Sequence, residues 1–277
     1  MMITNETLLR LRRVLTAREV PLVALVFALL AGLFITALQH RQERVAPPLV
    51  ALEPISVFPD FASFSDVRVK KQMFFDFLEL YIAEQNIRVG STRERLLELS
   101  EVVADGGPLS DDEQTELITT AERYFLDYDE MREPELLFEL LKRVDTVPAP
   151  LALAQAANES AWGTSRFTLE GNNIFGQWCY DEGCGMVPSR RRANASHEVR
   201  AFDSIDAAVQ AYFLNLNTHE RYQNFRDMRF QMRNQRGVLD PLVLAFGLEG
   251  YSERGDKYVD EIQTIIQQND LIDKYSG

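Results

Sequence analysis

Hydrophobic side chains recur with helical spacing along most of the chain after residue 65. Ser65 and Asp66 suit the N-cap of a helix, and the apolar positions that follow them fall on one broad face. That face comprises Val67, Met73, Phe74, Phe77, Leu78, Tyr81 and Ile82. The pattern predicts an amphipathic helix that packs on a core by this face.

Two Ser-x-x-Glu sequences predict the starts of further helices. Ser91 with Glu94, and Ser110 with Glu113, have the spacing of a capping box, in which each side chain bonds the other residue's backbone N–H. A Gly-Gly-Pro sequence before the second box predicts the end of the helix that begins at the first. A short leucine-rich helix is expected from Pro134.

The segment from Pro148 to Gly163 predicts a helix that is buried on nearly every face. Pro148 and Pro150 suit the first turn, where a backbone N–H has no partner inside the helix. The residues that follow are uncharged until Glu159, and we expect Gly163 to close the helix.

The periodicity changes after Trp178. Short apolar runs around residues 186–192 and 199–202 predict the two strands of a β-hairpin, which flank a loop from 190 to 197. Ser204 caps the next helix, and helices near Phe230, from Asp240 and from Tyr258 complete the pattern. The predicted fold class is mainly α, an α+β arrangement with one small hairpin.

The first 46 residues have a different character. Four arginines precede an uncharged run from Pro21 to Leu38, about the length needed to span a bilayer. This arrangement favours a cytoplasmic N-terminus and export of the remainder. A cleaved signal peptide is the alternative, but the run is long and no small-x-small site follows it. We expect an uncleaved single-pass anchor in the inner membrane, with the catalytic domain in the periplasm.

Charge divides the remaining chain into two regions. Residues 47–145, a proline-containing tether and the first predicted helices, hold 10 Lys and Arg against 22 Asp and Glu, a net charge of −12. Residues 146–277 hold 13 against 17, a net charge of −4. We interpret the acidic region as a helical brace for a catalytic domain at 146–277; a docking surface for a partner protein is the alternative. The total of −13 argues against nucleic acid as a partner.

The two cysteines are better suited to a disulfide than to a metal site. Cys179 and Cys184 have four residues between them, and this spacing can close as a small loop. Export would place both in an oxidising compartment, where such a bridge forms. With three histidines in the whole chain, we expect neither a metal nor a cofactor.

Glu159 is the one acid of its predicted helix, and it lies in the last turn. The negative end of the helix dipole and the apolar neighbours both disfavour the ionised carboxylate, so a raised pKa is expected. A carboxyl that stays protonated near neutral pH can act as a general acid. The alternative is an ordinary solvated acid at a helix end.

The residues after Glu159 favour a sugar-binding cleft. Four aromatic residues between positions 162 and 178 surround a polar Gly-Asn-Asn turn. Pyranose faces stack on aromatic rings, and amides bind hydroxyl and acetamido groups. The predicted substrate-binding residues in this stretch are Trp162, Asn172, Asn173, Phe175 and Trp178.

Three stretches carry a resemblance to a known family. AQAANESAWGTSRF at residues 154–167, GNNIFGQW at 171–178 and EVRAFDS at 198–204 resemble the Bax-type branch of the glucosaminidase family, glycoside hydrolase family 73. The resemblance covers about residue 144 to the C-terminus and extends more weakly to residue 58. It implies a lysozyme-like helical domain and an endo-β-N-acetylglucosaminidase that acts on peptidoglycan glycan strands, with Glu159 as the proton donor.

The resemblance also implies further site residues. The family takes its second acid from the hairpin, where Glu198 is our first choice and Glu182 and Asp181 are alternatives. Tyr251 matches a tyrosine that lies in the family's cleft. Independently of the resemblance, the basic cluster that begins at Arg190 either binds substrate carboxylates or lies at a solvated hairpin tip. A substrate whose own acetamido group attacks the anomeric carbon would need no second carboxylate.

Two other functions stay open at this stage. A muramidase or lytic transglycosylase shares the superfamily fold and can work with a single glutamate. A non-catalytic scaffold that binds the cell wall could keep the fold without turnover, although the intact sequence around Glu159 argues against it.

Overall fold

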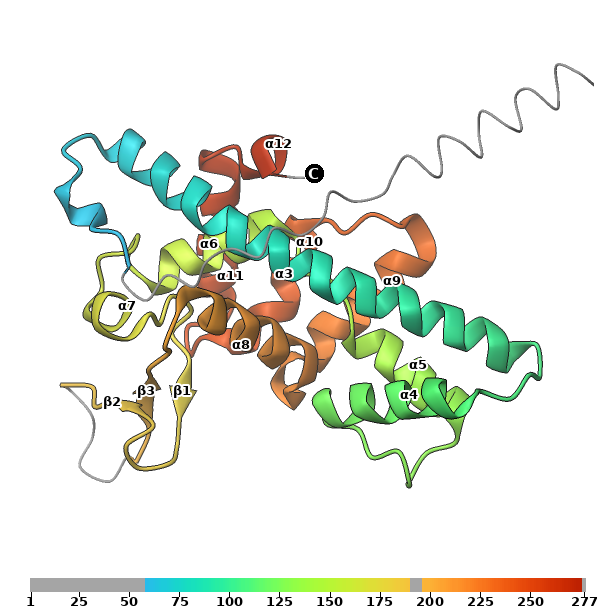
Figure 1. The fold of residues 1–277 in the computed structure, drawn as a ribbon. Coiled ribbons are helices and arrows are strands. Elements are labelled where there is room, and N and C mark those ends of the chain that lie inside the picture. Colours follow the sequence, from blue (N-terminus) through green and yellow to red (C-terminus); the bar gives the residue numbers. More distant parts are fainter. Residues whose placement is uncertain (1–57, 190–195, 276–277) are drawn as a thin grey trace, which may run out of the picture. The chain divides into compact units, whose positions relative to one another are not determined.

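Helix α3 (Val67–Ala104) is the longest element of the computed structural model, which describes residues 58–189 and 196–275. Asp66 caps its start, because its carboxylate accepts hydrogen bonds from the backbone N–H groups of the second and third helical residues. It packs against α5 (Glu133–Arg143), α6 (Ala149–Glu159) and α8 (Ile205–Thr218), as Figure 1 shows.

The helix start predicted at Ser91 and Glu94 is wrong, because α3 continues through both residues. Leu96 and Leu99, beyond the predicted start, are buried in the core. Their packing outweighs the local preference of a serine for a capping position. The second box is confirmed: Ser110 and Glu113 bond each other's backbone N–H groups at the start of α4 (Asp111–Arg123).

Helix α6 is buried as the sequence predicts. Residues 151–157 have no exposed surface, and the helix packs against α3 and α11 (Asp256–Gln268). It ends at Glu159, four residues before the expected Gly163. The chain leaves the helix early because Ala161, Trp162 and Gly163 have φ angles of 50°, 60° and 73°, which are incompatible with a right-handed helix.

Seven further elements complete the described unit. They are η1 (Phe61–Ser63), α7 (Arg166–Gly171), η2 (Glu220–Tyr222), α9 (Gln223–Arg236), α10 (Pro241–Leu244), η3 (Ala245–Tyr251) and α12 (Leu271–Tyr275). Ser204 and Asp240 cap α8 and α10 with their side chains, as predicted. The fold class of mainly α with a small β component is confirmed for this part of the chain.

The predicted hairpin is present, and a third strand joins it. Strand β3 (Glu198–Arg200) lies between β1 (Trp178–Cys179) and β2 (Gly185–Met186) and pairs antiparallel with both. The strands are shorter than predicted. Val199 is opposite Trp178 on one side and Met186 on the other, so β3 fixes the position of the cysteine loop relative to the tryptophan.

The boundary expected at residues 145 and 146 lies within a continuous hydrophobic core. The buried carboxylate of Asp145 lies 2.9 Å from Arg233, 3.7 Å from Arg93 and 3.9 Å from Arg229. Burial alone would raise the pKa of this carboxyl, but the three guanidinium groups outweigh burial and hold the pKa below its usual value. Arg93 belongs to α3 and the other two to α9, so a buried ionic network joins the acidic region to the region after it.

The N-terminal predictions concern residues outside the described part of the chain. The expected anchor, Pro21–Leu38, lies there. Within residues 58–189 and 196–275, no helix is both long enough and apolar enough to cross a membrane.

Candidate active site

Glu159 is the last residue of α6, and its side chain is half-buried. Burial raises the pKa of its carboxyl above the usual value. A hydrogen bond with the Tyr258 hydroxyl, the charge of Arg254 and the amide of Asn158 lower the pKa and offset part of that rise, while the charge of Glu261 adds to it. Burial prevails, so the carboxyl is shifted toward the protonated form that a general acid requires.

The turn after Glu159 is held by its own polar groups and by aromatic rings. The Ser160 hydroxyl accepts a hydrogen bond of 2.8 Å from the backbone N–H of Gly163. A Cβ on Gly163 would lie 2.7 Å from the rings of Phe58 and Phe61, so only glycine fits this position. Residues from the start of the acidic region therefore pack directly on the turn that follows the predicted acid.

The Asn-Ile-Phe-Gly sequence passes beside the Glu159 carboxyl. Gly176 has a φ of 64°, and a Cβ there would lie 2.9 Å from Glu159 Oε2. The close approach of this backbone is possible because the residue is glycine. Gly176 is therefore a site residue that the predictions missed, although its place in the motif offered a signal.

Asn172 and Asn173 are buried, and both amides bind backbone. Asn172 donates to the Phe202 carbonyl at 2.9 Å. Asn173 donates to the carbonyls of Gln177 and Arg200, both at 2.7 Å, and accepts from the Gln177 N–H at 2.9 Å. These bonds fix the loop to the chain around β3, so the amides shape the site rather than face a ligand.

The predicted aromatic residues do not form one cleft. Phe175 has no exposed surface, because its ring stacks on Tyr212 with centroids 3.8 Å apart. Trp162 is half-buried against Phe74 and Phe75, and the Lys71 ammonium lies 4.3 Å from the centre of its ring. Phe175 therefore belongs to the core, where no sugar can stack on it.

Trp178 is the most exposed of the predicted aromatic residues. Its side chain is 53% exposed, and one ring face is stacked on His197 with centroids 4.2 Å apart. It follows Gly176 by two residues, so consecutive Cα spacing keeps its Cα within about 8 Å of the Gly176 Cα beside Glu159. Its open face is suited to the apolar face of a pyranose.

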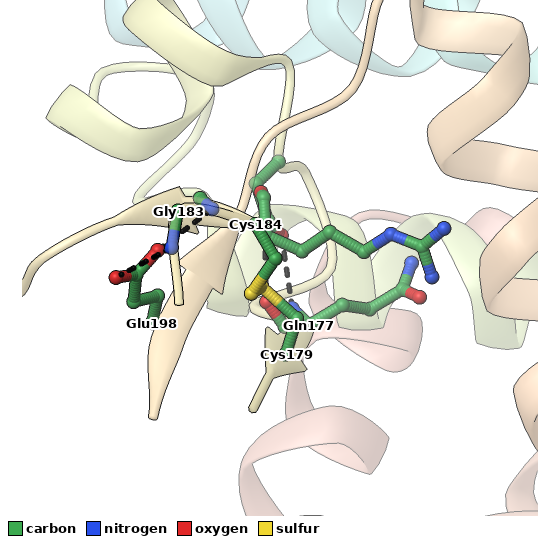
Figure 2. Close-up of a disulfide and its surroundings, with 8 residues drawn as sticks. Gln177, Cys179, Gly183, Cys184 and Glu198 are labelled. Atoms are coloured by element: carbon green, nitrogen blue, oxygen red, sulfur yellow. Dashed lines mark hydrogen bonds between the residues drawn. A yellow bond between two sulfur atoms is a disulfide. The ribbon is translucent and has the colours of Figure 1, made fainter. Parts of the chain in front are cut away.

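The hairpin acid Glu198 is buried and bound to backbone. Its carboxylate accepts hydrogen bonds from the N–H groups of Gly183 at 3.2 Å and Gly185 at 2.9 Å, as Figure 2 shows. The predicted disulfide is present, with Cys179 and Cys184 Cα atoms 6.2 Å apart. The carboxylate and the disulfide together hold the cysteine loop against β3. The alternative acids, Asp181 and Glu182, are exposed in that loop.

Tyr251 lies at the end of η3 and reaches the same loop as Gly176. Its hydroxyl donates to the Phe175 carbonyl at 2.7 Å, and its ring stacks on Tyr258 with centroids 5.5 Å apart. Arg190 lies outside the described residues. Among residues 58–189 and 196–275, no group of three or more His, Cys, Asp or Glu side chains could hold a metal ion.

A helical fold with a half-buried carboxyl at the end of a buried helix suits a glycan hydrolase, in which a protonated acid donates to the leaving group. Residues 135–271 match the glucosaminidase family, described as mannosyl-glycoprotein endo-beta-N-acetylglucosaminidase. The chain is also 29% identical over 214 residues to Protein bax of Escherichia coli (strain K12), covering 77% of this chain and 75% of that protein. No solved structure matches significantly. Residues 135–271 are therefore a glycoside hydrolase domain of the glucosaminidase family, and the likeness to Protein bax extends beyond this domain over most of the chain.

Proposed function

We propose that the protein is an endo-β-N-acetylglucosaminidase that cleaves the β-1,4 bond after N-acetylglucosamine in peptidoglycan glycan strands. The observation that carries this proposal is Glu159 itself, a half-buried carboxyl with a raised pKa at the end of an apolar helix. Glu159 protonates the glycosidic oxygen of the leaving sugar. Trp178 supports a sugar ring of the same strand through its exposed face.

The contacts of Glu198 favour a route in which the substrate supplies the nucleophile. Both Glu198 oxygens are held by backbone N–H groups, and the residue is 5% exposed. In the proposed route the acetamido oxygen of N-acetylglucosamine attacks C1 as the glycosidic C1–O bond breaks, and Glu159 gives its proton to the leaving oxygen. The intermediate is an oxazolinium ion, which keeps its N–H proton. Water then attacks C1 of this ion, the bond from C1 to the acetamido oxygen breaks, and the Glu159 carboxylate takes a proton from the attacking water. The acid is regenerated, and the sugar is released with its acetamido group restored.

Product analysis tests the bond specificity. Purified sacculi are digested with the protein, and the released fragments are identified by mass spectrometry. A reducing N-acetylglucosamine end is expected. A reducing muramyl end would indicate a muramidase, and an anhydromuramyl end would indicate a lytic transglycosylase. Binding to sacculi without any cleavage would indicate a scaffold.

Two variants and one substrate series test the mechanism. Glu159→Gln should lower turnover by a factor of about a hundred to ten thousand while leaving the fold intact. A glycan fragment with progressively fluorinated acetamido groups should be cleaved progressively more slowly, because fluorine makes the amide oxygen a weaker nucleophile. Two results together would contradict this route: equal cleavage rates along the fluorinated series, and a Glu198→Gln variant that folds normally but is inactive. They would indicate that Glu198 acts as the second carboxylate.

We further propose that an uncleaved anchor near the N-terminus holds the enzyme on the inner membrane, with its catalytic part in the periplasm. The apolar run from Pro21 to Leu38 supports an anchor, and the Cys179–Cys184 bridge fits an oxidising compartment. In spheroplasts, an external protease should degrade the catalytic domain. Protection from the protease, or recovery of the intact protein in the soluble fraction, would contradict this location.

A further inference from the structure

A line of buried polar side chains leads from the core to Glu159. The Tyr212 hydroxyl on α8 donates to Gln155 Oε1 at 2.6 Å, and Gln155 Nε2 donates to the Tyr258 hydroxyl on α11 at 2.9 Å. None of these three residues has exposed surface. Gln155 precedes Glu159 by four residues on α6, so both side chains lie on one face of the helix. Tyr258 and Glu159 are close enough for each side chain to shift the pKa of the other.

The order of donors along this line follows from counting hydrogens. Tyr212 has one hydroxyl hydrogen and gives it to Gln155, so the amide oxygen of Gln155 is an acceptor. The amide NH₂ then points to Tyr258, whose oxygen accepts a hydrogen bond from it. The single hydroxyl hydrogen of Tyr258 is left for Glu159. Because Tyr212, Gln155 and Tyr258 have no exposed surface, bulk water does not compete for the hydrogen bonds among these three residues.

We propose that Tyr212, Gln155 and Tyr258 are positioning residues that keep the Tyr258 hydroxyl directed as a donor toward Glu159. The proposal rests on the proposed function, in which Glu159 becomes a carboxylate each time it protonates a leaving group. A donor already directed at that carboxylate stabilises the charge as it develops and needs no reorganisation. Burial holds the proton on Glu159 between turnovers, and Tyr258 makes its release easier.

Other charged and titratable groups also face Glu159, and a test must leave them unchanged. Arg254 and Glu261, which form an ion pair, act on its carboxyl from the loop before α11 and from α11. Three more tyrosines lie close enough to interact with it electrostatically, and they are Tyr212, Tyr222 and Tyr251. Tyr258→Phe removes one hydroxyl oxygen and keeps the ring stacked on Tyr251, so it isolates the last link of the line.

The principal test is the pH dependence of cleavage of a defined peptidoglycan glycan fragment by Tyr258→Phe. Loss of a hydrogen bond to the carboxylate raises the pKa of Glu159, so the alkaline limb of the kcat profile should move up by about one pH unit. The plateau of kcat should fall by about tenfold or more, with little change in KM. Tyr212→Phe should move the limb in the same direction by less, because Gln155 could then turn its oxygen toward Tyr258.

Tyr124→Phe is the matched control, because Tyr124 is also a buried tyrosine and no contact joins it to Glu159. It should leave the limb in place. A carbon-13 titration of the Glu159 carboxyl without substrate, assigned with Glu159→Gln, should show the same upward shifts in pKa without any turnover. This second readout keeps the test independent of the reaction.

The outcomes separate this proposal from the proposed function. If Tyr258→Phe is slower but neither the limb nor the carboxyl titration moves, the line of side chains serves the fold alone and the proposal is overturned. If Tyr258→Phe does not fold, Tyr212→Phe decides in its place, and an unmoved titration there overturns the proposal as well. If Glu159→Gln retains full activity, the proposed function fails. The carbon-13 titration of Glu159 in the wild type, compared with that in the tyrosine variants, still tests whether Tyr212, Gln155 and Tyr258 direct a hydrogen bond to this carboxyl.

Discussion

Replacing Asp145 by asparagine should destabilise the protein far more than replacing an exposed acid. The side chain is 2% exposed and is held by Arg229, itself 0% exposed, together with Arg233 and Arg93. Removing one member of a buried ionic network costs about 3–5 kcal/mol. Arg229 keeps hydrogen bonds to four backbone carbonyls after the change, and the asparagine oxygen still accepts from Arg233. We therefore expect Asp145→Asn to lower the free energy of unfolding by about 3 kcal/mol, the lower end of this range.

Thermal unfolding followed by circular dichroism measures this loss. For a unit of this size, about 3 kcal/mol corresponds to a fall in Tm of roughly 6–12 °C. Asp206→Asn is the matched control, because that carboxylate meets Arg88 at 3.3 Å where both side chains are partly exposed. Its cost should stay below about 1 kcal/mol.

The pH dependence of the same variant tests the cause. The folded pKa of Asp145 is held below its unfolded value. The stability that the carboxylate contributes is therefore complete above the unfolded value of about 3.9 and is lost as the pH falls through the folded pKa. The gap between wild type and Asp145→Asn should narrow as the pH falls below about 4. An Asp145→Asn variant that unfolds at the wild-type temperature at pH 7 would refute the reasoning.

Four further changes have distinct expected results. At pH values above the folded pKa of Glu159, Glu159→Gln should have a higher free energy of unfolding than the wild type, because it removes a charge whose burial is unfavourable. Urea titrations should show that this gain in stability vanishes below about pH 4, where the wild-type acid is neutral in both the folded and the unfolded state. Gly163→Ala should cost more than about 3 kcal/mol, since its methyl would strike two phenylalanine rings, whereas Gly106→Ala, at φ 78° with open space around it, should cost about 1 kcal/mol. Glu198→Gln should cost about 1–3 kcal/mol and speed hydrogen exchange in β2 and β3, because the glutamine NH₂ cannot accept the hydrogen bond of one of the two backbone N–H groups. Reducing the disulfide should lower stability by about 2 kcal/mol, the loop-closure value for so short a loop; no change on reduction would contradict it.

Helices that are determined by their own residues can be predicted from the sequence. Helix α6 is uncharged before Glu159, so its burial follows from its own residues. The box at Ser110 and Glu113 starts a helix through its own two reciprocal bonds. The box at Ser91 and Glu94 has the same spacing but lies inside α3, where the burial of leucines further along the helix keeps it continuous. Both sequences have the Ser-x-x-Glu pattern, and tertiary packing determines whether a helix begins there.

The aromatic residues of the candidate site also show that the local sequence does not reveal tertiary packing. Phe175 and Trp178 are three positions apart in one motif, and both suit a sugar-binding cleft by composition alone. Tyr212, on a helix much further along the chain, stacks on Phe175 and closes it into the core. Trp178 lies at the edge of the small sheet, where its ring stacks on His197 and its side chain stays 53% exposed. No local feature separates the two residues, because their partners come from distant segments.

The local sequence around Glu159 predicts the direction of its pKa shift but not the distant residues that surround it. Its place at the end of an apolar helix predicts a raised pKa, and the structure agrees. Two of the groups that offset this rise, Tyr258 and Arg254, come from α11 and from the loop before it. The turn after the acid packs on residues that precede the family-matched segment 135–271. A Cβ on Gly163 would lie within 3.2 Å of Phe58, Phe61 and Phe74. The acidic region is therefore more than a solvated brace, because its first residues form the surface against which the turn beside Glu159 is held.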